Sequence, residues 1–121
     1  MHKTLTAFAH ADTPATFDRR RPERLVEGNP LRPTWNHFER DGMSAGLWSC
    51  EPGAWRIAFA DETDEFFHVL SGCIRITDEG GLARTFGPGE ACVIPAGFKG
   101  VFEVLEAVTK HDVFVKRGEM A

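Results

Sequence analysis

The stretch GPGEACVIPAGFKG, residues 87–100, combines two turn signals with a short apolar segment between them. Gly87-Pro88-Gly89 predicts a tight turn, because glycine adopts positive φ without steric cost and proline fixes φ. Pro95-Ala96-Gly97 predicts a second turn, and proline at this place also interrupts regular backbone hydrogen bonding. The stretch therefore predicts a strand bounded by turns, with another strand beginning near Phe98.

Similar turn signals, formed by glycine and proline, recur outside this stretch over most of the chain. From Trp35 onward glycine or proline recurs at short intervals, and the segments between are rich in aromatic and β-branched residues. The predicted strands include residues 55–59, 73–77, 98–104 and 108–115. Asp78-Glu79-Gly80-Gly81 separates two such segments and predicts a hairpin turn. Evenly spaced short strands are typical of an all-β sandwich or barrel.

Composition narrows the class of protein further. The chain has 121 residues, enough for one domain, and a formal net charge of −4, which argues against a broad nucleic-acid surface. The longest apolar runs are too short to cross a bilayer, and residues 1–9 lack a secretory h-region. Three widely spaced cysteines, Cys50, Cys73 and Cys92, predict free thiols and a cytoplasmic protein.

The N-terminal part differs from the rest. Prolines stand at positions 14, 22, 30 and 33, and Arg19-Arg20-Arg21 forms a basic run. Because proline disrupts both helices and strands, we predict an N-terminal arm over residues 1–23 and a β domain over residues 24–121. The apolar pieces Leu5–Ala9 and Leu25–Val26 could each add an edge strand. The arginine run is interpreted as a solvated part of the arm.

Two motifs make the prediction more specific. EFFHVLSG, residues 65–72, and the stretch 87–100 together resemble the two motifs of the cupin superfamily, with Gly89, Pro95 and Gly97 at the cupin spacing. RLVEGNP (24–30), SAGLWSCEPG (44–53) and FKGVFE (98–103) are similar to small cupins grouped with ethanolamine-utilisation and ureidoglycine-aminohydrolase-like domains. The resemblance covers about residues 24–115. It implies a cupin jelly-roll β-barrel that forms a homodimer.

The resemblance also implies where a metal would bind. Metal-binding cupins supply an H-x-H pair, a glutamate and a later histidine. Glu65 keeps the glutamate position, but the paired histidine positions fall at Phe59 and Asp61, or at Ala58 and Ala60 after a one-residue shift. The later position is Gly100. Since a metal needs three or four donors, we predict no metal cofactor.

Strand alternation predicts which residues face the cavity. Counting from Glu65 places Phe67 and Val69 inward and His68 outward. A buried Glu65 needs a cationic partner, for which Lys110, Arg56 and Arg75 are candidates. The other interpretation is a barrel filled by side chains, with no room for a ligand. The predicted pocket comprises Trp48, Trp55, Phe59, Phe67, Phe102, Lys110 and His111.

Three functional hypotheses follow. The first is a small-molecule-binding cupin, including a metal-independent enzyme acting on a small nitrogenous or carboxylate metabolite, the class that the resemblance implies. Glu65 is its candidate acid or base, since a buried carboxyl has a raised pKa. The second is a non-catalytic binding or structural partner in amine or amino-acid catabolism. The third is a metal-dependent enzyme with unusual ligands, including Glu65 and His111. None involves nucleic acid or membrane.

Overall fold

The computed structural model describes residues 3–9 and 13–118, and within these residues it contains strands and one short 3₁₀ helix but no α-helix. None of the described helical structure is long and apolar enough to cross a membrane. The elements in chain order are β1 (Thr16–Asp18), η2 (Pro22–Arg24), β2 (Leu25–Glu27), β3 (Arg32–Arg40), β4 (Met43–Cys50), β5 (Gly53–Ala58), β6 (Thr63–Asp78), β7 (Ala83–Phe86), β8 (Ala91–Ile94) and β9 (Lys99–Lys116).

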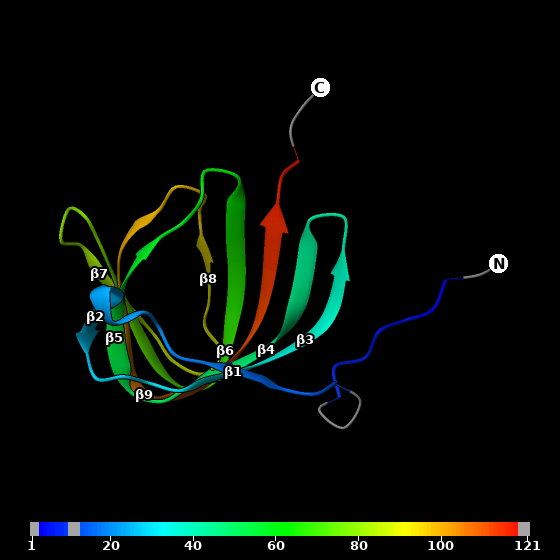
Figure 1. Cartoon of the computed structure of the whole chain (residues 1–121), viewed down its shortest axis with the longest axis horizontal. Coiled ribbons are helices and arrows are strands. Elements are labelled where there is room, and N and C mark those ends of the chain that lie inside the picture. Colours follow the sequence, from blue (N-terminus) through cyan, green and yellow to red (C-terminus); the bar gives the residue numbers. More distant parts are fainter. Residues whose placement is uncertain (1–2, 10–12, 119–121) are drawn as a thin grey trace.

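Two long antiparallel strands, β6 and β9, organise the sheet. The first part of β9 pairs with β5, its later part pairs with β4, and β6 pairs along its other edge. β6 in turn pairs with β8 near its start and with β7 near its end. The sheet curls around these two strands and leaves one side open, as Figure 1 shows. The predicted all-β jelly roll is confirmed.

The bend in the two long strands depends on a glycine. The β6–β9 register shifts three times between Val69 and Ile74, and Gly72 lies within that segment with φ of 84°. A Cβ atom at Gly72 would lie 2.1 Å from the carbonyl oxygen of Ala107. Glycine is therefore the residue that permits both the positive φ and the close approach of the backbones.

Local predictions at the turns and in the arm have mixed outcomes. The Asp78–Gly81 turn is present, with the Gly81 amide donating to the Asp78 carbonyl at 3.0 Å. Leu25–Val26 does form an edge strand, which pairs with β5. Leu5–Ala9 forms none, and the arm contributes β1 instead, paired with β3. Residues 1–2 and 10–12 of the predicted arm lie outside the described residues.

The core fills one part of the space inside the curled sheet. Trp55 is almost completely buried and stacks on Phe102, with ring centroids 5.1 Å apart, while Trp48 meets both rings edge-on. Phe67 and Val69 are fully buried on β6. The three cysteines are unpaired thiols, as predicted. The aromatic cluster borders the cavity described next.

Candidate functional site

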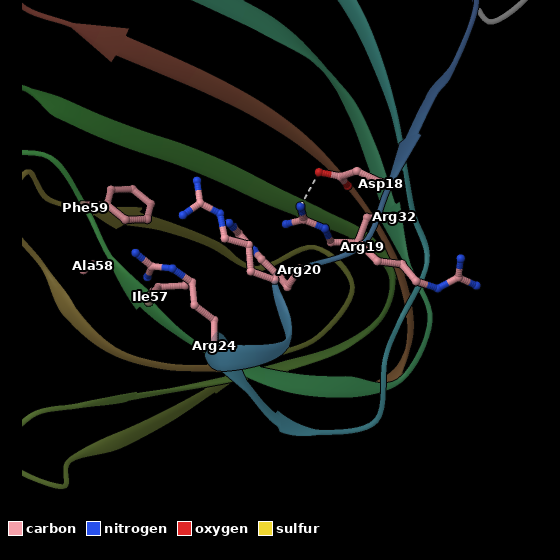
Figure 2. Close-up of a pocket in the computed structure, with 9 residues that line it drawn as sticks. Asp18, Arg19, Arg20, Arg24, Arg32, Ile57, Ala58 and Phe59 are labelled. Atoms are coloured by element: carbon pink, nitrogen blue, oxygen red, sulfur yellow. Dashed lines mark hydrogen bonds and ion pairs between the residues drawn. The ribbon is translucent and has the colours of Figure 1, made fainter.

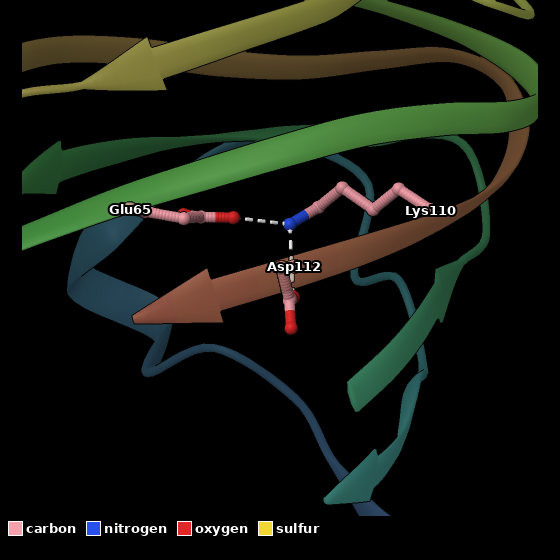
Figure 3. Close-up of polar contacts among 3 residues, drawn as sticks. All are labelled: Glu65, Lys110 and Asp112. Carbon is pink, nitrogen blue, oxygen red and sulfur yellow. Dashed lines mark hydrogen bonds and ion pairs between the residues drawn. The ribbon is translucent and has the colours of Figure 1, made fainter. Parts of the chain in front are cut away.

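Three charged side chains meet on the inner face of the sheet. Glu65 comes from β6, whereas Lys110 and Asp112 come from β9. In the β6–β9 register, Phe67 lies opposite Asp112 and Val69 opposite Lys110, so alternation directs all three charged side chains inward. Each is at least 94% buried. Figure 3 shows the Lys110 ammonium between the two carboxylates.

The contacts within this Glu65–Lys110–Asp112 triad are ionic. Lys110 Nζ donates to Glu65 Oε2 and, at 3.1 Å, to Asp112 Oδ2. The same ammonium lies 4.6 Å from the centre of the Trp48 ring and 5.2 Å from that of Phe67. Hydrogen bonds and aromatic faces thus replace the water that this charge loses on burial. The predicted partner Lys110 is the one that Glu65 contacts.

The other two candidate partners of Glu65 lie elsewhere. Arg75 pairs with Glu103, with Nη2 2.7 Å from Oε1. The guanidinium of Arg56 donates to the carbonyl of Glu23 in η2. In each strand the residues on either side of the arginine are buried: Ile74 and Ile76 flank Arg75, and Trp55 and Ile57 flank Arg56. Strand alternation therefore directs both side chains away from the triad.

The triad holds one ammonium between two carboxyl groups, and this imbalance affects titration. Burial raises the pKa of Glu65 above its usual 4.5, and the nearby Asp112 adds to the rise although Lys110 opposes it. Burial alone lowers the pKa of Lys110, but Glu65 and Asp112 reverse this effect and raise it. The charged form of Lys110 is therefore favoured, and Glu65 takes up a proton more readily than an exposed glutamate does.

A cavity of about 220 Å³ adjoins the triad. Its wall includes Glu65, Lys110 and Asp112 together with the predicted pocket residues Trp48, Trp55, Phe59 and Phe102. Phe67 is not part of this wall, because it packs behind Lys110 and edge-on against Phe86. The cavity contradicts a barrel filled completely by side chains.

His111 is a correction to the predicted pocket. It lies opposite His68 in the β6–β9 register, on the outer face of the sheet, and Phe8 contacts its ring edge-on. The reason is strand alternation, since adjacent residues of a strand point to opposite faces and Lys110 points inward. His111 therefore cannot join Glu65 in a metal site. His68 lies on the outer face as predicted.

The cavity has a mouth that the sequence did not reveal. A second space of about 320 Å³ shares Asp18, Arg20, Arg32, Ile57 and Phe59 with the first. Arg20 was expected in a solvated run, yet it is partly buried and its guanidinium lies over the Trp55 ring. Figure 2 shows Arg20 and Arg32 together at this mouth, with Arg32 bound to Asp18.

Three residues of the site, Asp112, Arg20 and Arg32, were absent from the predicted pocket. Asp112 shares a strand face with Lys110, so alternation from Lys110 would have placed it inward. Arg20 gave no such signal because it lies in an irregular segment between β1 and η2, and Arg32 gave none because no strand was predicted at its position, where β3 begins. The position of Arg20 follows from the packing of its segment over Trp55 of β5, and that of Arg32 from its place at the start of β3.

The side chains of this site do not fit the metal of a typical cupin. Phe59 and Gly100 carry no donor atom, and Asp61 lies in the exposed turn before β6. Glu65 faces the ammonium of Lys110, which would repel a divalent cation. Among residues 3–9 and 13–118, no three His, Cys, Asp or Glu side chains are grouped to hold a metal ion. The absence of a metal cofactor stays a prediction.

The curled antiparallel sheet and its turns define a cupin domain. Residues 39–111, more than half of the chain, match the family model described as the EutQ-like cupin domain. The chain belongs to this EutQ-like cupin family, which confirms the predicted resemblance. No curated protein sequence matches the chain.

Solved structures agree with the fold. A protein of unknown function from the DUF861 family of Pseudomonas syringae has a TM-score of 0.75 and 18% identity over 84% of this chain; the chain spans only 44% of that protein. EutQ of Clostridium difficile has a TM-score of 0.64 and 21% identity, covering 82% of this chain and 80% of its own. A putative ethanolamine utilisation protein Q of Salmonella typhimurium has a TM-score of 0.63 and 15% identity, and the match covers 88% of this chain and 98% of that protein. Identities this low support the fold alone.

Proposed function

We propose that this protein binds a small nitrogenous or carboxylate metabolite in the barrel cavity, without a metal ion. The observation that carries the proposal is the buried triad at the cavity wall. Removing three charged groups from water is costly, and hydrophobic residues of similar volume often stabilise a core at least as well. Charged side chains that border a concave space are instead suited to orient a bound molecule.

Glu65 is the group that we propose for proton transfer to such a ligand. Its pKa is raised by burial, and a carboxyl of this kind can release or accept a proton at a higher pH than an exposed one. Lys110, held in place by two carboxylates, would orient the ligand and stabilise negative charge. Binding without turnover would favour the second hypothesis, a non-catalytic binding partner.

The indole N–H signals of the three tryptophans provide a direct test. Trp48 and Trp55 line the cavity, whereas Trp35 is the neighbour of the cavity-lining Thr34 and points to the other face of β3. We expect at least one of ethanolamine, glycine, urea, acetate or succinate to shift the Trp48 and Trp55 signals saturably in ¹⁵N-correlated NMR spectra. The Trp35 signal is the internal control. If none of the five shifts the cavity signals, the proposal is wrong.

We also propose that the protein is a homodimer, in which the outer face of the sheet is covered. Phe66 and Val93 lie opposite each other on β6 and β8 and are 45% and 59% exposed. Light scattering is expected to give the mass of a dimer at micromolar concentration, and Phe66→Asp is expected to give a monomer. Leu82→Asp, at an exposed position beside the hairpin turn, is the matched control. A monomeric unmodified protein would contradict the proposal.

A further inference from the structure

Three buried N–H groups at the cavity lack an acceptor within the described part of the chain. They are Nε of Arg20, Nε of Arg32 and Nε1 of Trp55, and all three residues line the cavity. Buried donors in folded proteins are almost always paired, because an unpaired one loses its hydrogen bonds to water without replacement. Three such donors around one space indicate that an acceptor binds there.

The positive charge at the mouth is only partly balanced, since the described residues that line it include one carboxylate, Asp18, beside several arginines. Arg32 is only 8% exposed, and its Nη2 lies 2.5 Å from Oδ2 of Asp18. The guanidinium groups of Arg20 and Arg32 lie 5.6 and 5.5 Å from the centre of the Trp55 ring. Burial and then the positive charge of Arg32 lower the pKa of Arg20 to about 10. A second anion beside Asp18 would relieve this repulsion.

We propose that Arg20, Arg32 and Trp55 form a subsite for an oxyanion, the carboxylate or phosphate group of the cavity ligand. The inference rests on the proposed function, since it describes one end of the same ligand. Planar guanidinium groups match the paired oxygens of a carboxylate or phosphate, and the indole N–H supplies a further donor.

Size and charge narrow the class of ligand. The cavity of about 220 Å³ holds a molecule of only a few heavy atoms in addition to its oxyanion. Its inner wall carries two carboxyl groups against one ammonium, which disfavours a dianion. The subsite therefore fits a small carboxylate best, with the carboxylate at Arg20 and Arg32 and its other end toward Lys110.

The test titrates the full chain with sodium acetate and, separately, with inorganic phosphate at constant ionic strength set by chloride. The readouts are the Trp55 indole signal and the Nε–H signals of the arginines. We expect acetate to shift these signals saturably and Arg20→Gln to raise its Kd about ten- to a hundred-fold, the loss of one hydrogen bond from a charged donor. Arg40→Gln, an exposed arginine at the far end of the strand that carries Arg32, should leave the Kd unchanged.

The possible results of these titrations bear differently on the oxyanion subsite and on ligand binding in the cavity. Tighter binding of phosphate with the same dependence on Arg20 would support the oxyanion subsite and assign it to phosphate esters. Binding of ethanolamine or urea without any response to acetate, succinate or phosphate would overturn the subsite but not the cavity. An acetate Kd unchanged in both Arg20→Gln and Arg32→Lys would overturn it as well. No response to any probe would overturn both proposals.

Discussion

Lys110→Met is expected to lower the free energy of unfolding by about 3–5 kcal/mol at pH 7. The methionine keeps much of the apolar volume of the lysine stem, so little of this loss comes from packing. It comes from Glu65 and Asp112, which would stay buried without the ammonium that now contacts both. Urea unfolding followed by tryptophan fluorescence measures the loss.

The pH dependence of this loss identifies its cause. A carboxyl whose pKa is raised in the folded state contributes its full stability below its ordinary pKa and loses it as the pH rises through the raised value. Burial raises the pKa of Glu65, and removal of Lys110 raises it further. The gap between Lys110→Met and the unmodified protein should therefore narrow as the pH falls from 7 toward about 4.5.

Two further variants serve as controls for Lys110→Met. Lys99→Met removes the same charge at an exposed position and should change stability by less than about 0.5 kcal/mol. Glu65→Gln should cost about 1 kcal/mol, because Lys110 keeps Asp112 at 3.1 Å. Equal losses for Lys110→Met at pH 5 and pH 7 would contradict an electrostatic origin.

Gly100→His is expected to destabilise the protein by about 3 kcal/mol and not to create a metal site. This substitution restores the histidine that the second cupin motif leads one to expect. A Cβ atom at Gly100, however, would lie 2.1 Å from the carbonyl oxygen of Thr77, in the paired strand β6. A backbone oxygen within the sheet cannot move aside as a flexible side chain would, so the β6–β9 pairing has to distort.

Thermal unfolding and elemental analysis together check this expectation. Gly118→His is the matched control, because a Cβ atom there meets no atom of the described residues within 4 Å. We expect its melting temperature to equal that of the unmodified protein, and neither variant to retain Mn, Fe, Ni or Zn after dialysis. A stable Gly100→His protein with stoichiometric metal would show that the backbone at Gly100 tolerates a side chain.

Strand periodicity was sufficient to place many of the inward-facing side chains. Alternation from Glu65 places Phe67 and Val69 on its own face, and the Phe59 register places Trp55 and Ile57 inward, as the structure has them. The same rule should have separated Lys110 from His111. Both were named as pocket candidates, and their faces were left open because no residue in their strand had been anchored to a partner.

The sequence by itself determined the turns, the cupin motifs and the alternation that buries Glu65, because these depend on residues close together in the chain. Only the tertiary structure decided that Glu65 meets Lys110 and Asp112, since that contact depends on the pairing of β6 with β9, which lie far apart in the chain. Only the tertiary structure likewise brought Arg20 and Arg32 to the cavity. Arg20 lies in an irregular segment that packs against Trp55, and Arg32 reaches the same ring from the first residue of β3.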